Sequence, residues 1–422
     1  MPDGLSNAPK YEKTPAGIVG FTNIESLPPT LIDSFSRLRV SAPAYRFDSQ
    51  LTYRVDSDLW DSKTSGGSIA HSASERWATL TANASGINSA ILQSHYHSPY
   101  TPGRSQLAFI TFLMGAAPAT AGYKRAGYFD GTNGIYLERT ETAVNLVLKS
   151  TTSNGSETVP QSAWNLDPMN GSGPSGLTLD LSKMQILVVQ LQALYVGRVV
   201  IGFDIAGEVV PVHQFTCANE EAFPYIAQAS LPVRYEVGGT AATGSATVMQ
   251  AVCASVISEG GEKLSEIPGR PFIATGTTAN TATAVVCAIR CKAQLNSINQ
   301  NALVIPTDVD ISITDAGAWV SILLNPTISA GTFEDVSAAS SVEMSFAGNT
   351  GTDPTISANG TILEKFYVAS SASARAERSA GIGGKAVLAY SHLLGAGDVL
   401  AVLVEGGATT DSFCSLKWRE IR

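Results

Sequence analysis

Residues 185–213 have the sequence QILVVQLQALYVGRVVIGFDIAGEVVPVH, in which three short apolar runs follow one another at close spacing. The runs are Gln185–Leu191, Arg198–Phe203 and Val209–His213, and valine, isoleucine and leucine dominate them. Each run has the length and the residue types of a β-strand rather than of a helix. Strands that follow one another without helices between them are typical of a sandwich or jelly roll, and not of βαβ units.

The same pattern extends along the chain in both directions and predicts an all-β fold. Ile135–Glu138 and Ala143–Lys149 are expected to pair as a hairpin, and turn dipeptides precede the first of them. The polar, glycine-bearing segment Ser258–Pro268 is the best candidate for a linker. We therefore expect a jelly-roll-like β-sandwich over residues 51–265 and a second β-sandwich over residues 266–422. The last strand, Cys414–Ile421, should hold the C-terminus in place, so truncation there is expected to be damaging.

The first fifty residues differ from the rest because prolines interrupt them at intervals that prevent a long helix or a central strand. These prolines are Pro2, Pro9, Pro15, Pro28, Pro29 and Pro43. Short apolar groups such as Ile18–Phe21 and Leu31–Ile32 lie between them, and Leu31–Leu38 is a short helix candidate. We expect residues 1–50 to form an extended attachment arm with apolar anchor points. The alternative is an ordinary loose terminus.

Composition and charge limit the classes of function. Hydrophobic residues make up 44% of the 422 residues and charged residues only 15%, where about 25% charged is usual. This combination is not that of a disordered chain, which has few apolar residues and many charges. The net charge of -9, from 27 basic and 36 acidic residues, argues against a nucleic-acid partner and against a polybasic membrane anchor. The composition suits strands joined by turns and surfaces buried against neighbouring chains.

No membrane span and no secretion signal are expected. The best apolar candidate, Ile186–Phe203, is interrupted by Gln190, Gln192 and Arg198. The residues after Met1 include neither a basic region nor an apolar one of the kind that a secretory signal needs. The 5 cysteines are scattered and odd in number, which does not suit a disulfide framework. These features predict synthesis in a reducing cytoplasm.

Metal and nucleotide sites find little support in the motifs. His95 and His97 would share one face of a strand, and Cys287 and Cys291 have the spacing of one helical turn, but no further residues have ligand spacing. Residues 171–176 match GxGxxG, yet the strand before and the helix after that a dinucleotide site needs are both missing from the pattern. We therefore expect no metal and no cofactor.

Paired carboxylates and exposed aromatic rings would be the mark of a sugar-cleaving or sugar-binding jelly roll. Four acidic residues lie on or beside predicted strands, where two of them could face each other across a cleft: Glu138, Asp180, Asp204 and Glu208. Four aromatic residues could stack on a sugar ring: Trp60, Trp77, Tyr96 and Tyr100. The simpler interpretation places the carboxylates in turns or on the solvent face and the aromatic rings in the core. On that interpretation we assign no catalytic residue.

A set of short segments resembles a known family. Asp33–Ser41, followed by Phe47–Gln50, resembles the N-terminal signature of structural proteins in tailed-bacteriophage virions. Further segments that resemble this family are Tyr100–Gly103, Gly127–Asp130 with Asn133 and Gly134, Gln161–Asn165, Ser175–Asp180, Gly197–Phe203, His213–Phe215, Leu231–Glu236 and Leu416–Ile421. The resemblance covers most of the chain, and most strongly the part from Asp33 to Gly261.

The resemblance implies a non-enzymatic component of a phage virion, of tail, baseplate, fibre or capsid-surface type. Such a protein is made in the bacterial cytoplasm and is then located in the virion, and we expect it to be a homotrimer that binds other virion proteins. Assembly through the arm is assigned to Phe35, Arg37, Leu38, Arg39 and Phe47. Arg37 and Arg39 are two apart in an extended segment, so they could pair with carboxylates of a neighbouring subunit; the alternative is an ordinary exposed basic pair.

Three rival functions stay open at the level of sequence. The chain could be a module that recognises a host-surface glycan, a capsid decoration protein, or a polysaccharide depolymerase. The last requires a pair of carboxylates in one cleft, and the sequence alone does not place them together.

Overall fold

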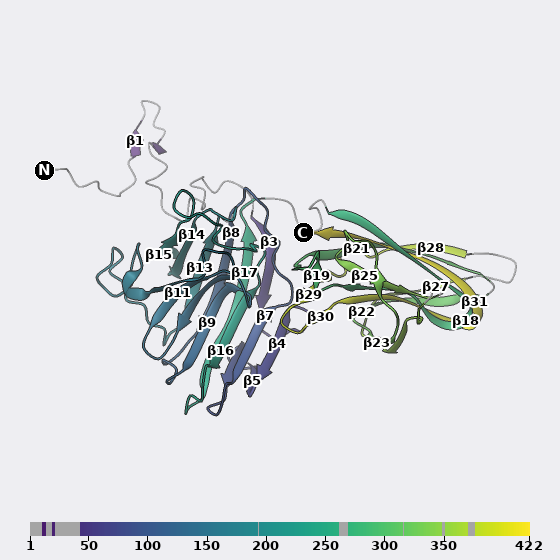
Figure 1. Ribbon diagram of the computed structural model, residues 1–422, viewed down its shortest axis with the longest axis horizontal. Helices are drawn as coiled ribbons and strands as arrows, with labels where there is room; N and C mark the ends of the chain where they lie inside the picture. Colours follow the sequence, from purple (N-terminus) through teal and green to yellow (C-terminus); the bar gives the residue numbers. More distant parts are fainter. Residues whose placement is uncertain are drawn as a thin grey trace. The chain divides into compact units, whose positions relative to one another are not determined.

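The fold is described from a computed structural model (Figure 1). The structure describes residues 11–13, 19–21, 43–192, 194–260, 269–314, 316–347, 351–369 and 376–422. The chain divides into two compact units, Met1–Lys263 and Leu264–Arg422, and each is described by itself. The predicted arm residues Phe35, Arg37, Leu38 and Arg39 lie outside the described residues.

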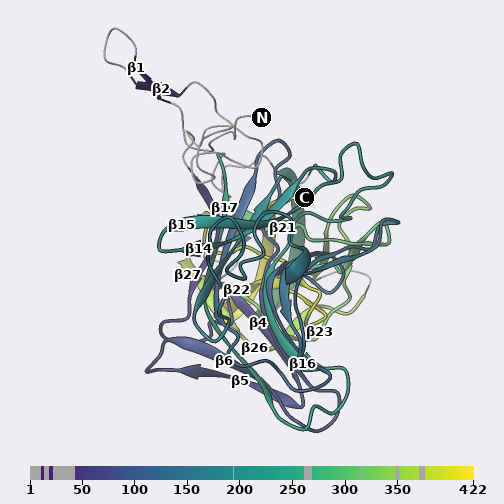
Figure 2. The same cartoon turned by 90° about the vertical axis from the view of Figure 1, so that its left-hand side faces the viewer.

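The N-terminal unit contains two large antiparallel sheets. The first has seven strands in the spatial order β12 (Glu157–Pro160), β11 (Val144–Lys149), β10 (Gly134–Arg139), β9 (Gly122–Phe129), β16 (Val233–Gly239), β7 (Ser89–Ser94) and β4 (Trp60–Ser65). The second has the order β15 (Glu208–Phe215), β14 (Val199–Ile205), β13 (Gln185–Leu191), β8 (Gln106–Leu113), β17 (Thr247–Ser258), β6 (Trp77–Ala82) and β5 (Gly67–Ser72), and β3 (Ala44–Gln50) also pairs with β17. Figure 2 shows β5 and β6 side by side. A short pair, β1 (Tyr11–Lys13) and β2 (Val19–Phe21), precedes them.

Alternation along the strands explains why the two sheets pack together. On β16, Val233, Tyr235 and Val237 are fully buried in a core that also contains residues of the second sheet. Arg234 and Glu236 alternate with them, so they point to the opposite, outer face of the seven-stranded sheet. The unit is therefore a β-sandwich whose core lies between the sheets, which confirms the prediction of an all-β fold.

The strands predicted within residues 185–213 and the predicted hairpin are also confirmed. The three runs in residues 185–213 form β13, β14 and β15, which are neighbours in one antiparallel sheet. The predicted hairpin is β10 with β11, in which Ile135 pairs with Leu148. Gly134, the first residue of β10 after the turn from β9, has φ of +134°, and an added Cβ there would lie 2.2 Å from the Cα of Phe129. Only glycine fits at this position, which is why the Asn-Gly signal marks it.

The predicted arm boundary at residue 50 is wrong, because Ala44–Gln50 is a strand of the sandwich. Phe47 on β3 is 2% exposed, and its ring packs edge-on against Trp60 with centroids 5.3 Å apart. Phe47 pairs across the sheet with Val256 of β17. Its assignment to assembly is corrected accordingly, since a side chain in the sandwich core cannot also contact a neighbouring subunit. Pro43 precedes the strand directly and does not interrupt it.

The C-terminal unit is built around two long strands, β18 (Arg270–Cys291) and β31 (Val399–Ile421), which pair with each other along most of their length. The first part of β31 also pairs with β22 (Ala318–Leu324), and its last part pairs with β21 (Leu303–Ile313). An added Cβ at Gly276 would lie 2.1 Å from the carbonyl oxygen of Val286, in the same strand. The two halves of β18 therefore come together, so the long strands contribute to both layers of a second sandwich around one apolar core.

Shorter strands complete this unit. They are β19 (Gln294–Leu295), β20 (Ile298–Asn299), β23 (Thr327–Ala330), β24 (Glu334–Asp335), β25 (Val342–Phe346), β26 (Thr355–Ala358), β27 (Thr361–Val368), β28 (Ala376–Gly381), β29 (Tyr390–Ser391) and β30 (Ala396–Gly397). β25 extends the sheet beside β18, β27 pairs with β22, and β28 pairs with β21. Within the described part of the chain, none of the helical structure is long and apolar enough for a membrane crossing.

Candidate functional site

A row of three charged side chains crosses the outer face of the seven-stranded sheet. Arg125 on β9 is directly opposite Glu138 on β10 and directly opposite Glu236 on β16. Side chains at paired positions of neighbouring strands point to the same face. We call Glu138, Arg125 and Glu236 the charged row.

The charged row is held by a set of hydrogen bonds. Arg125 donates from Nε to Glu138 Oε2 at 2.8 Å and from Nη1 to Glu236 Oε1 at 3.4 Å. The hydroxyl of Tyr123 donates to the same Oε1 at 2.9 Å. Arg234 donates to Glu236 Oε2 from Nε at 2.9 Å and from Nη2 at 2.7 Å. Glu236 therefore receives four hydrogen bonds, three of them from guanidinium groups, which is the strong, charge-assisted kind.

Two tyrosine rings flank Arg125. Its guanidinium carbon lies 4.0 Å from the ring centroid of Tyr123 and 5.4 Å from that of Tyr136. The Tyr123 ring lies against Gly238 of β16, where an added Cβ would come within 2.5 Å of the tyrosine oxygen. The glycine leaves the space that the ring fills, so the outer face is closely packed around Arg125.

A second set of polar contacts continues the face beyond the charged row. Arg234 donates to Gln93 Oε1 at 3.1 Å, and its guanidinium lies 5.4 Å from the ring centroid of Phe129. Asp61, opposite Gln93 on β4, is 2.7 Å from Nδ1 of His95. The outer face thus carries alternating charges that are already paired with one another.

Burial and neighbouring charges shift the pKa values of these groups. Burial by itself would raise the pKa of Glu236, but Arg234 and Arg125 hold it below its usual value. Burial, together with the negative charge of Glu236, raises the pKa of Tyr123 to about 12. On the core side of β9, burial lowers the pKa of Lys124 to about 8. Glu236 is therefore ionised at neutral pH and cannot donate a proton as a general acid.

The four carboxylates weighed as a catalytic pair are not paired with one another. Glu138 belongs to the charged row, but the partner carboxylate there is Glu236. Asp180 accepts hydrogen bonds from the backbone and hydroxyl of Ser182, and Asp204 accepts one from the backbone N–H of Gly207, so both stabilise turns. Glu208 is exposed at the start of β15. The simpler interpretation, that these residues serve turns and solvent faces, holds for them.

The predicted aromatic candidates lie in or beside the core. Trp60 is fully buried, and its indole N–H donates to the hydroxyl of Ser49 at 2.7 Å. Tyr96 packs against Phe47, and the hydroxyl of Tyr100 donates to the carbonyl of Gln192 at 2.8 Å. Trp77 is half-buried at the start of β6. The interpretation as packing residues is the one that fits this arrangement.

The histidines and cysteines weighed as metal ligands are separated by the fold. His95 and His97 follow the end of β7 and are not on a strand; His97 Nε2 lies 3.7 Å from Asp130 Oδ2. Cys287 and Cys291 are buried in β18, and burial raises the pKa of the Cys287 thiol to about 12. Among the residues that the structure describes, no three His, Cys, Asp or Glu side chains are grouped to hold a metal. Residues 171–176 form a loop between the bridged Asn170 and Thr178, and not the start of a helix.

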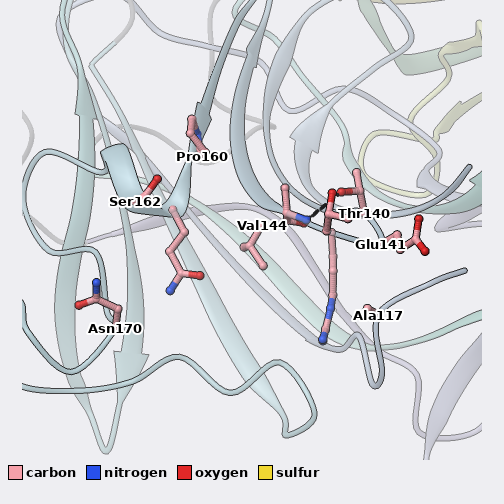
Figure 3. A pocket seen from close by; sticks show the side chains of 11 residues that line it. Ala117, Thr140, Glu141, Val144, Pro160, Ser162 and Asn170 are labelled. Carbon is pink, nitrogen blue, oxygen red and sulfur yellow. Dashed lines mark hydrogen bonds between the residues drawn. The ribbon is translucent and has the colours of Figure 1, made fainter. Parts of the chain in front are cut away.

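Two cavities lie next to the turn between β10 and β11. The first has a volume of about 370 Å³ and borders the charged row through Arg125 and Glu138, with Tyr123 beside them. Its other lining residues are Ala121, Gly122, Thr140, Glu141, Thr142 and Thr240. The second, of about 430 Å³, shares Thr140, Glu141 and Thr142 with the first. Figure 3 shows Ser162 and Asn170 on one side of this second cavity and Glu141 and Ala117 on the other.

Reasoning from sequence missed Arg125 and Glu236 as partners of Glu138. One signal was present: Arg234 and Glu236 alternate with Val233, Tyr235 and Val237, so they had to lie on the face opposite the core. What they contact there depends on pairing between strands that are about a hundred residues apart in the chain.

Comparisons with known proteins give likenesses of fold only. No family model matches the chain, and no curated protein matches it. Among solved structures, a Bacillus licheniformis β-glucanase is 11% identical, with a TM-score of 0.34, and the match covers 50% of this chain and 97% of that one. A legume lectin-like domain from Entamoeba histolytica is 11% identical, with a TM-score of 0.29, over 47% of this chain and 89% of that one. A glycoside hydrolase family protein from Mycobacterium thermorestibile is 11% identical, with a TM-score of 0.35, over 50% and 99%.

Proposed function

We propose that the chain is a non-enzymatic structural component of a bacteriophage virion, located in a tail, baseplate, fibre or other external appendage and assembled as a homotrimer with other virion proteins. One observation carries the proposal: the segments that resemble the virion family contact one another and stabilise the fold. Trp164 stacks on Phe203 with ring centroids 6.3 Å apart. Asn165 exchanges hydrogen bonds of 2.9 Å with the backbone of Gln214 in both directions. Contacts of this kind fix the shape of the unit, and a structural building block needs a fixed shape.

The chemistry of the outer face supports binding or assembly over depolymerisation. A glycosidase needs one carboxylic acid that keeps its proton and a second carboxylate that is free to act. In the charged row, Arg125 lies between the two carboxylates and bonds to both, at 2.8 and 3.4 Å. Because the pKa of Glu236 is lowered as well, that carboxyl is not the proton donor that a glycosidase needs.

The arm hypothesis is tested by two deletions that the position of β3 defines. Removing residues 1–42 keeps β3 and should leave the N-terminal unit folded while the chain is no longer incorporated into particles. Removing residues 1–50 also removes β3 with Phe47, and should destabilise the unit itself, since deleting a buried phenylalanine side chain alone costs about 3–5 kcal/mol. Incorporation is measured by immunoblotting of purified particles, and folding by thermal melting. Normal incorporation of the shorter deletion would reject the arm.

A second candidate function is recognition of a host-surface glycan, and the cavity of about 370 Å³ favours it. This volume is within the range of about 300–1,000 Å³ that is usual for small-molecule sites. Thr140, Glu141, Thr142 and Thr240 are among its lining residues, and hydroxyl and carboxylate side chains of this kind can bind the hydroxyls of a sugar.

The second candidate is tested on a microarray of bacterial surface polysaccharides. Replacing Glu141 and Thr142 together by alanine should weaken binding about tenfold or more, because both groups line the cavity and neither belongs to the charged row. Glu75→Ala, at an exposed turn of the same unit, is the matched control and should bind as the unmodified chain does. Equal binding by the unmodified chain, the double variant and Glu75→Ala would reject this cavity as a glycan-binding site.

A further inference from the structure

Two aromatic rings lie exposed on the outer face of one layer of the C-terminal unit. Trp319 on β22 is 49% exposed and Tyr367 on β27 is 47% exposed, and the two positions are directly opposite each other. Glu405 on β31 is opposite Trp319 on its other side, and Lys365 is two residues before Tyr367. We call Trp319, Tyr367, Lys365 and Glu405 the aromatic platform.

The four side chains contact one another and define a small surface. The rings of Trp319 and Tyr367 are 5.3 Å apart at an angle of 62°. Lys365 Nζ lies 2.9 Å from Glu405 Oε2 and 5.8 Å from the ring centroid of Trp319. The Tyr367 hydroxyl lies over Gly317, where an added Cβ would approach it to 2.3 Å. Each ring is thus held by neighbours on the sheet while about half of its surface stays open to solvent.

Most apolar residues next to the aromatic platform are already covered, although Ile362 of β27, opposite Leu323, is 48% exposed. Leu323 and Leu403, on the same face of β22 and β31, are buried in a small cluster that Phe333 and Ile356 pack against. A stable protein interface needs about 1,200–2,000 Å² of buried surface, and the aromatic platform with Ile362 beside it offers too few side chains to hold a second protein. A ligand with one small apolar face and polar groups at its edge fits this surface better.

We propose that the aromatic platform binds a sugar ring of a surface polysaccharide. A pyranose presents C–H groups on one face, which stack on the open side of an aromatic ring, and hydroxyls at its edge. Lys365 donates to such hydroxyls and Glu405 accepts from them; both side chains are about two-fifths exposed, at 41% and 37%. This combination of exposed aromatic area with a donor and an acceptor beside it is the chemistry that sugar recognition requires.

The proposal goes beyond a structural role in the virion, and it does not depend on the cavity of the N-terminal unit. The experiment compares the full chain with its Trp319→Ala and Tyr367→Ala variants on the microarray of bacterial surface polysaccharides. Tyr53→Ala is the matched control, because Tyr53 is 86% exposed in the N-terminal unit. Melting curves of every variant establish that it is folded.

We expect the unmodified chain and Tyr53→Ala to bind at least one polysaccharide equally. Trp319→Ala should bind it at least about tenfold more weakly, and Trp319→Phe should recover part of the lost affinity. Binding by none of the proteins, or equal binding by Trp319→Ala, would overturn the proposal. Sedimentation in which Trp319→Ala abolishes self-association would overturn it too, because a second copy of the chain would then cover the platform. A failure of the virion role is distinguishable, since it is measured on particles and not on polysaccharide.

Discussion

Replacing Arg125 by methionine is expected to lower the free energy of unfolding of the N-terminal unit by about 3–5 kcal/mol. The methionine fills part of the space but leaves Glu138 and Glu236 facing each other without the cation between them. Their side chains are only 13% and 7% exposed, so water cannot replace the lost partner. The change is measured as a shift of the unit's unfolding transition in urea.

The control for this prediction is an ion pair at the surface of the same unit. Lys183 lies 3.7 Å from Asp180, and the two side chains are 78% and 48% exposed. Lys183→Met should therefore cost less than about 1 kcal/mol. Adding Glu138→Gln to Arg125→Met should recover part of the lost stability, because one buried charge is removed. If Arg125→Met cost no more than Lys183→Met, the charged row would not be the stabilising network described here.

Removing residues 418–422 is expected to prevent the C-terminal unit from folding while the N-terminal unit still melts as before. Trp418 is 1% exposed in the core, and loss of such a side chain alone costs about 3–5 kcal/mol. Glu420, also buried, accepts hydrogen bonds from the Ser340 hydroxyl at 2.6 Å and the Ser341 backbone N–H at 2.9 Å. The deleted residues also pair with β18 on one side and β21 on the other. The deletion therefore removes core side chains and also hydrogen-bonded pairs of both ladders.

Differential scanning calorimetry separates the two units if each gives its own transition. Deletion of Arg422 alone is the control, and it should keep both transitions with a small shift, since Arg422 contributes its contacts with Glu420, the Ala339 carbonyl and the Phe272 ring but no core side chain. Two unchanged transitions after removal of residues 418–422 would contradict the role assigned to the end of β31.

Local patterns were enough to predict the strands and the nearest pairings. Valine- and isoleucine-rich runs between glycines predicted β13, β14 and β15, which pair in the order of the chain. The start of β10 requires glycine at residue 134 for steric reasons. A single sequence is therefore enough to mark this position. The prediction that Cys414–Ile421 forms a strand rests on alternation, since Leu416 and Trp418 both lie in the core.

Contacts between distant segments could not be predicted from the same patterns. Whether Ala44–Gln50 lies on the body depends on β17, about two hundred residues later in the chain, so the prolines before it suggested an arm instead. The charged row depends on β16 lying beside β9, which no local feature of either strand specifies. The long strands β18 and β31 contribute to both layers because β18 bends between Gly276 and Val286, where its register with β31 shifts at Thr278–Thr283, and no glycine or proline between those two residues marks that bend in the sequence.

The central claim, that the chain is a virion building block, is tested most directly by antibody labelling of purified phage particles in the electron microscope. The antibodies are raised against the full chain, and the particles come from the lysate that contains it. The claim predicts label at a fixed, repeated position on intact particles. Unlabelled particles, with the chain confined to the soluble fraction of the same lysate, would contradict it.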